Sequence, residues 1–172
     1  MTAALLRDDG TGTASRITAL VGPAGSGTTS LALLACHDAR VRHRFGGGVL
    51  WLTVGRERAP AEVAALLYGM FREAARARPP GCRGLLPPLP VDRPPADAGP
   101  LARHLADQLL GHGPMLLVAD DVATPAQLEP LEVLARQMWL LVTTSDPGLP
   151  PPGHRRVEVG ALDEAAAREV LT

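Results

Sequence analysis

The apolar positions of the chain follow two different periods, which predict strands that alternate with helices. Nearly continuous apolar runs, typical of strands covered on both faces, occupy residues 17–21, 48–54, 115–119 and 139–143, with a weaker run at 156–159. Apolar residues at helical spacing occupy residues 28–38, 61–78, 101–110 and 125–135, and Asp163 is suited to cap a last helix that reaches Leu171. This order predicts an α/β fold of three layers, with a mainly parallel five-stranded sheet and a ligand at the carboxyl ends of its strands.

Two stretches show neither period. Residues 1–15 are rich in Gly, Thr and Asp, so we expect a flexible lead-in before a domain that spans residues 16–172. Residues 79–100 carry eight prolines, which remove amide donors and disfavour both helix and sheet, so we expect a Pro-rich insert in that domain. A length of 172 residues with 46% hydrophobic content suits one domain with one sizeable core.

A glycine-rich loop joins the first predicted strand to the first predicted helix. Residues 22–29 fit the phosphate-loop pattern G-x-x-x-x-G-K-[S/T], except that Thr28 stands at the lysine position. The glycines let successive amides point at phosphate oxygens, and the start of the helix adds unpaired amides and its positive dipole end. The Thr29 hydroxyl stands where it would bind Mg²⁺. The residues expected to bind the nucleotide are Gly22, Pro23, Ala24, Gly25, Ser26, Gly27, Thr28, Thr29 and Ser30.

Two considerations limit what this loop predicts. The glycine spacing alone has little value in a chain with 18 glycines, so an ordinary β-α turn without a ligand is the alternative, which the order of strand, loop and helix disfavours. Thr28 is neutral and cannot carry a cation to the β- and γ-phosphates, and the chain contains no lysine at all. Losing a charge-assisted hydrogen bond costs about 1.5 to 3 kcal/mol, so we expect weaker affinity and still weaker turnover.

Polar side chains end the third and fourth predicted strands. Asp120 and Asp121 follow the apolar run 115–119 directly, and we assign Asp120 to Mg²⁺ and Asp121 to a catalytic base that polarises a water. The alternative is that the two acids cap the next turn. Thr143 and Thr144 could bond a γ-phosphate or its water, although threonine is also a common strand residue.

Composition excludes several other classes of function. The net charge is only -1, with 17 basic and 18 acidic residues, so we expect no direct binding of nucleic acid or membrane. The chain has neither an apolar membrane-spanning run nor a signal peptide, and we expect it in the cytoplasm. Cys36 and Cys82 lack the spacing of a metal site and are expected to be reduced thiols.

The order of these motifs resembles the NB-ARC class of STAND signal-transduction NTPases over roughly residues 16–171. The segments that carry the resemblance are 17–30 as the phosphate loop, 45–54 as the second-strand motif, 115–122 as Walker B, 141–147 as the sensor motif and 157–168 as the strand and helix that follow. The resemblance implies a P-loop NTPase fold in which the sensor strand lies between the phosphate-loop and Walker B strands. The sequence departs from the family at Thr28 and at Ser145, where the family usually has a sensor arginine.

What the resemblance implies for function is a switch that ADP holds closed and ATP exchange opens. We therefore predict a module that binds ATP or ADP with Mg²⁺, hydrolyses weakly or not at all, and works with protein partners or further domains of the same assembly. The chain ends before the helical and winged-helix parts of such proteins, so we expect a fragment or a truncated relative. The competing hypotheses are an active P-loop ATPase or small-molecule kinase, and an interaction scaffold that has lost its ligand.

Overall fold

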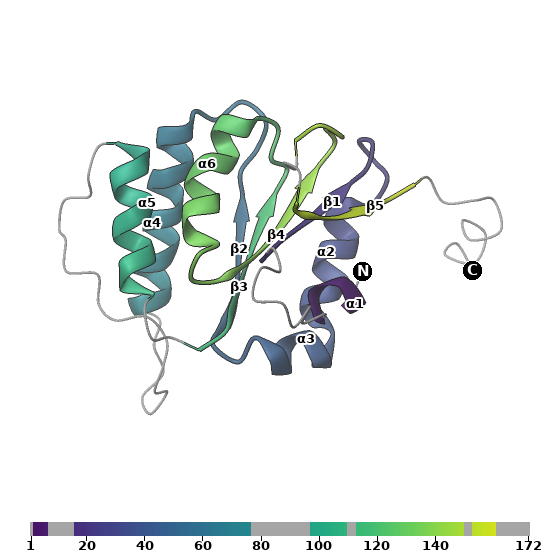
Figure 1. The fold of residues 1–172 in the computed structure, drawn as a ribbon, viewed down its shortest axis with the longest axis horizontal. Helices are drawn as coiled ribbons and strands as arrows, with labels where there is room; N and C mark the ends of the chain where they lie inside the picture. The colour runs from purple at the N-terminus through teal and green to yellow at the C-terminus, as the bar shows by residue number, and fades with distance from the viewer. Residues whose placement is uncertain (1, 7–15, 77–96, 110–112, 150–152, 161–172) are drawn as a thin grey trace.

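The five predicted strands form one parallel sheet within the part of the chain that the structure describes (Figure 1). The computed structural model describes residues 2–6, 16–76, 97–109, 113–149 and 153–160. The strands are β1 (Ile17–Val21), β2 (Gly48–Thr53), β3 (Met115–Asp120), β4 (Trp139–Thr144) and β5 (Arg155–Glu158). Their order is β2-β3-β4-β1-β5, with parallel pairing throughout. The predicted α/β fold is confirmed, and the sensor strand β4 lies between β1 and β3, as the family resemblance implied.

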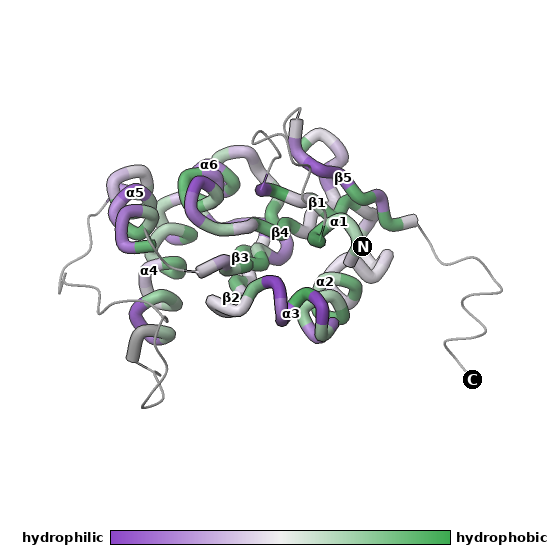
Figure 2. The backbone as a smooth tube through the Cα atoms, turned by 60° about the horizontal axis from the view of Figure 1, so that its bottom comes forward, coloured by the Kyte–Doolittle hydropathy of each residue, from purple (hydrophilic) through white to green (hydrophobic). Residues whose placement is uncertain are grey.

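Helices cover both faces of this sheet and make three layers (Figure 1). One face carries α4 (Pro60–Arg76), α5 (Ala98–Gln108) and α6 (Pro125–Leu134), and the other carries α1 (Thr2–Leu6), α2 (Thr28–His37) and α3 (Ala39–Arg44). In β3, Leu117 packs toward the first group of helices, whereas Leu116 and Val118 pack toward the second. Both faces of the central strands are therefore apolar, and Figure 2 shows hydrophobic green along the middle of the sheet, with purple segments in α3 and α5.

The register of the sheet brings the carboxyl ends of four strands to one edge. Val21 of β1 lies opposite Thr144 of β4, and Thr53 of β2 lies opposite Asp120 of β3. The backbone continues this pairing beyond the strands, since the amide of Gly22 donates to the carbonyl of Thr144 over 3.1 Å. The phosphate loop, the acid pair and the fourth-strand threonines therefore meet at the edge where open parallel sheets bind ligands.

The N-terminal segment corrects the expectation of a flexible lead-in. Residues 2–6 form α1, and Leu5 is buried among the apolar residues on the α2 and α3 face of the sheet. Arg155 donates to the carbonyl of Ala4 over 2.7 Å, and Arg44 donates to the carbonyl of Leu6. Residues 2–6 thus form a helix within the segment where the sequence predicts a flexible lead-in, because one buried leucine and two arginine contacts hold a helix too short to show periodicity. Residues 7–15 lie outside the described part.

Two further elements differ from the sequence prediction. Helix α3 was not predicted. Its residue Val41 and the residue that ends it, Phe45, are both buried. Helix α5 begins at Ala98, three residues before the predicted start, and includes Pro100. Proline is tolerated there because the first turn of a helix has no intrahelical acceptor for its amides. Most of the predicted Pro-rich insert and the predicted last helix from Asp163 lie outside the described residues.

The side chain of Asp38 caps the start of helix α3. Asp38 precedes the helix and accepts hydrogen bonds from the backbone amide of Arg40 over 2.8 Å and from its guanidinium. These bonds, with the side-chain bond as the largest cause, lower the pKa of Asp38 from 3.8 to about 2. A carboxyl group with a lowered pKa contributes stability that is present above its unfolded pKa and is lost as the pH falls through its folded pKa.

Replacing Asp38 with alanine is therefore expected to lower the thermal unfolding midpoint modestly at pH 7. The difference between wild type and the Asp38→Ala variant should shrink as the pH falls through about 2, where the carboxyl group of the wild type becomes protonated. Thermal unfolding followed by circular dichroism at several pH values would measure both effects. A difference that stays constant across this range would contradict the charged cap.

One of the two cysteines and several helices lie in the described part of the chain. Cys36 is a free cysteine, and burial raises the pKa of its thiol. Cys82 lies outside the described part of the chain. None of the helices that the structure describes is long and apolar enough to cross a bilayer.

Candidate nucleotide-binding site

The loop between β1 and α2 has the backbone that a phosphate cradle needs. Gly25 and Gly27 have φ angles of +82° and +87°, in the left-handed region that side chains disfavour. A Cβ atom on Gly22 would lie 2.6 Å from the carbonyl oxygen of Val159 and 2.5 Å from Ser26 Oγ. Gly27 also precedes the first turn of α2, whose unpaired amides and dipole end favour an anion.

One hydroxyl group inside this loop has no hydrogen-bond partner within the described part of the chain, which bears on whether the loop fits a ligand. Ser26 Oγ is buried and has no hydrogen-bond partner among the residues that the structure describes. Buried polar groups without a partner are rare in folded proteins and indicate a missing water, ion or ligand when they occur. This hydroxyl lies close to Gly22 within the loop, and the glycine backbone around it fits a phosphate-binding loop.

The two residues predicted to bind the metal are in direct contact. Thr29 Oγ1 at the start of α2 donates to Asp120 Oδ1 over 2.8 Å, and Thr143 Oγ1 of β4 donates to the same oxygen over 2.7 Å. Asp120 is buried at the end of β3, with 7% of its surface exposed. Thr143 thus holds the carboxylate in place, and its hydroxyl also accepts the backbone amide of Asp121 over 2.9 Å.

The donor set fits magnesium better than a metal held by protein alone. Within the described residues, no group of three His, Cys, Asp or Glu side chains could hold an ion. Mg²⁺ commonly keeps several waters and binds through one or two carboxylates together with substrate phosphates. The Thr29 hydroxyl and the Asp120 carboxylate are the protein groups that would hold such an ion.

Asp121 has a backbone conformation that few residues adopt. Its φ angle is 60°, and it is the one non-glycine residue with a positive φ in the described part of the chain. Such conformations cluster at functional sites, and aspartate tolerates them better than most residues. The Asp121 side chain is 42% exposed and accepts a hydrogen bond from Arg56 Nε over 3.2 Å. The predicted base is therefore engaged by an arginine.

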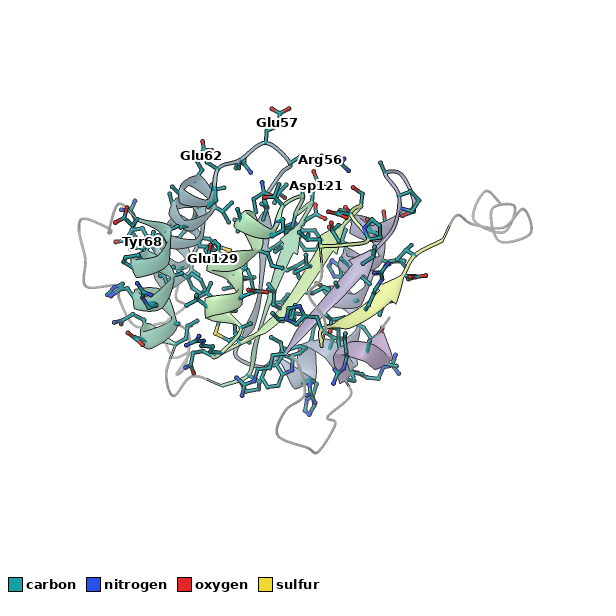
Figure 3. All side chains as sticks on the ribbon, turned by 45° about the horizontal axis from the view of Figure 1, so that its top comes forward. Arg56, Glu57, Glu62, Tyr68, Asp121 and Glu129 are labelled. Carbon is teal, nitrogen blue, oxygen red and sulfur yellow. The ribbon has the colours of Figure 1, made fainter. Side chains whose placement is uncertain are left out.

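Sequence reasoning missed Arg56. This residue follows β2 and the turn at Gly55, and its guanidinium also donates to Ser145 Oγ over 2.9 Å. Figure 3 shows Arg56 beside Asp121 at the carboxyl edge of the sheet, whereas Glu57 points away into solvent. The signal that could have found Arg56 is its position just after a strand, since all strand ends of a parallel sheet share this edge.

One pocket brings most of the predicted residues together. Its lining consists of Gly22, Pro23, Ala24, Gly25, Thr28, Thr29, Thr53, Arg56, Asp120, Asp121, Thr143, Thr144 and Ser145. Three predicted residues, Ser26, Gly27 and Ser30, are not part of this lining. The hydroxyl of Thr144 accepts the amide of Asp146 over 3.1 Å and so stabilises the turn after β4.

The fold and the pocket define a P-loop NTPase domain, in which a glycine loop, a helix start and a buried Walker B acid line one pocket. The family comparison agrees with this class. The model of the NB-ARC domain matches residues 1–149, and the chain belongs to the NB-ARC family. It is therefore a nucleotide-binding P-loop module. The match includes residues 1–15, which the sequence pattern places before the domain.

Comparison with solved structures supports the fold. The chain is similar to PCH-2 of C. elegans, with a TM-score of 0.52 and 14% sequence identity. The similarity covers 98% of this chain and 41% of PCH-2, so the chain spans less than half the length of that protein. No curated protein matches the sequence.

Proposed function

We propose that the chain is the switch module of a STAND-type signalling protein, which binds ADP or ATP with Mg²⁺ and hydrolyses ATP weakly or not at all. The observation that carries this proposal is the 2.8 Å contact between Thr29 Oγ1 and Asp120 Oδ1 in the pocket lined by the phosphate loop. A hydroxyl and a buried carboxylate beside a cradle of amides are the groups that hold a magnesium-bound diphosphate. Mg²⁺ would supply positive charge that offsets the charge of the phosphates.

Weak hydrolysis is proposed because the lysine position of the phosphate loop carries no positive charge. The neutral Thr28 lines the pocket at that position. Backbone amides, the start of α2 and Asp120 remain available for binding, so affinity should suffer less than turnover.

The role as a switch rests on membership of the NB-ARC family. In this proposal, ADP favours one arrangement of the assembly and ATP favours another, because the two nucleotides differ in their contacts at the carboxyl edge of the sheet. Protein partners or further domains of the same assembly would transmit the change, and the cytoplasm is the proposed location.

ATP hydrolysis is the second candidate function. Asp121 lines the pocket and its side chain is 42% exposed, so a water can reach its carboxylate. A partner that contributes an arginine would make this candidate an ATPase. The fold alone is also compatible with a small-molecule kinase and with an interaction scaffold without a ligand, so an experiment has to separate all four functions.

Calorimetric titration of the purified chain with Mg-ADP and Mg-ATP, followed by an assay of phosphate release, tests these candidates. Binding of either nucleotide with negligible phosphate release supports the switch. Binding with sustained phosphate release in the presence of ATP alone supports the ATPase. Formation of ADP without phosphate release, only when an acceptor molecule is added, supports the kinase, because the phosphoryl group then leaves on the acceptor. Absence of binding for both nucleotides contradicts the proposed function and leaves the scaffold.

A further inference from the structure

We propose that Arg56 supplies the positive charge to the γ-phosphate of bound ATP, a charge that Thr28 cannot supply. This inference rests on the proposed function and adds one residue to the same site. Arg56 belongs to the loop between β2 and α4, whereas a lysine in the motif would belong to the first turn of α2. The positive charge that contacts the phosphate would thus come from the loop after β2 and not from α2, within the same chain.

The charges around the pocket make Arg56 the candidate. Among the described residues that line the pocket, Arg56 is the one basic residue, and Asp120 and Asp121 are acidic. Several phosphate charges added to two carboxylates repel one another unless a cation is near. The neighbouring Arg58 is already engaged, since its Nη1 atom donates to the carbonyl oxygens of Thr53 and Val54 at the end of β2.

The present partners of Arg56 are ones that a phosphate can replace. Its guanidinium bridges Asp121 and Ser145, which directly follow β3 and β4 at the edge of the sheet. The side chains of Arg56 and Asp121 are 51% and 42% exposed, and exposed ion pairs contribute little net stability. A phosphate carries more charge than one carboxylate, and the planar guanidinium matches its oxygens with two parallel hydrogen bonds.

A buried glutamine fixes the backbone on both sides of Arg56 through hydrogen bonds. Gln127 of α6 has 1% of its surface exposed, and its Nε2 atom lies 2.9 Å from the carbonyl oxygens of both Gly55 and Arg58. Its Oε1 atom accepts the amide of Ala123 over 2.9 Å, which ties the loop to the segment just after the acid pair. With the backbone held in this way, only the Arg56 side chain has to reorient toward a phosphate.

The exchange has a consequence for Asp121. The hydrogen bond from Arg56 Nε to Asp121 Oδ1 is 3.2 Å long, so the guanidinium cannot turn to a phosphate without weakening this contact. Occupancy of the γ-phosphate position therefore frees the Asp121 carboxylate, and ADP leaves Arg56 with Asp121. One arginine would distinguish the two nucleotides and control the predicted base at the same time.

The test is calorimetric titration of wild type, Arg56→Gln and Arg56→Lys with Mg-ATP and with Mg-ADP. The Arg56→Gln variant is expected to bind Mg-ATP about tenfold to a hundredfold more weakly, the loss typical of a charged hydrogen bond, and to bind Mg-ADP nearly as wild type does. Arg56→Lys keeps the charge but loses the planar pair of donors, so its affinity for Mg-ATP should lie between those of wild type and Arg56→Gln. Arg103→Gln is the matched control, since it removes one exposed arginine from α5, outside the pocket lining.

The outcomes separate this inference from the function on which it rests. If wild type binds Mg-ATP and Arg56→Gln binds it equally well, or loses both nucleotides equally, the inference is overturned and the binding proposal stands. If wild type binds Mg-ADP alone, the γ-phosphate contact is likewise overturned. If wild type binds neither nucleotide, both proposals fail. Equal unfolding midpoints of the variants without nucleotide exclude misfolding as the cause of a loss.

Discussion

Replacing Thr28 with lysine is expected to tighten the binding of Mg-ADP and Mg-ATP by about tenfold to a hundredfold, which corresponds to about 1.5 to 3 kcal/mol. Thr28 is the first residue of α2 and lines the pocket beside Thr29. A lysine there would extend its ammonium group toward the phosphates that the loop amides hold, and the wild-type chain has no lysine that competes for this role. Calorimetric titration of the two proteins measures the gain.

The matched control for this gain is Thr28→Met. Methionine is long and unbranched like lysine but carries no charge, so it separates electrostatic attraction from a change in the shape of the loop. Tighter binding by the lysine variant alone would show that the first turn of α2 faces the phosphates. If wild type binds and neither variant differs from it, the nucleotide does not reach Thr28, and our assignment of the loop is wrong.

The parallel sheet could be predicted from the sequence because burial on both faces leaves a simple pattern. In β3, all six residues are buried, and the apolar run ends at the same acid that ends the strand. The two short helices could not be predicted in this way. Their stability comes from single buried residues such as Leu5 of α1 and Val41 of α3, which are tertiary contacts that no periodicity records.

In the candidate site, too, the sequence predicts the residues of local motifs but not those that tertiary contacts bring in. The phosphate loop and the acid pair are local motifs, so sequence spacing located both, and the 2.8 Å contact of Thr29 with Asp120 is consistent with their predicted pairing. Arg56 belongs to no motif and enters the pocket because β2 lies next to β3 in the sheet. In the sequence, Gln127 is an ordinary helix residue. Its burial and its hydrogen bonds in the structure show that it fixes the loop of Arg56.

Replacing Asp120 with asparagine is expected to remove most of the effect of Mg²⁺ on nucleotide affinity. Asparagine retains an oxygen that accepts the hydroxyls of Thr29 and Thr143, so the fold around the site should persist while the negative charge is lost. Changes to groups that orient a metal or its waters typically cost about 10-fold to 100-fold in metal affinity. Titration with ADP in the presence of Mg²⁺ and in the presence of EDTA measures the effect.

Asp121→Asn provides the comparison for this variant, since it removes the same charge one residue further along. Its side chain is 42% exposed and pairs with Arg56, whereas Asp120 is 7% exposed and contacts Thr29. If Mg²⁺ still strengthens ADP binding in Asp121→Asn but not in Asp120→Asn, the buried acid alone serves the metal. Equal losses in the two variants would mean that Mg²⁺ responds to the summed charge of the pocket, and the separate roles assigned to the two acids would be wrong.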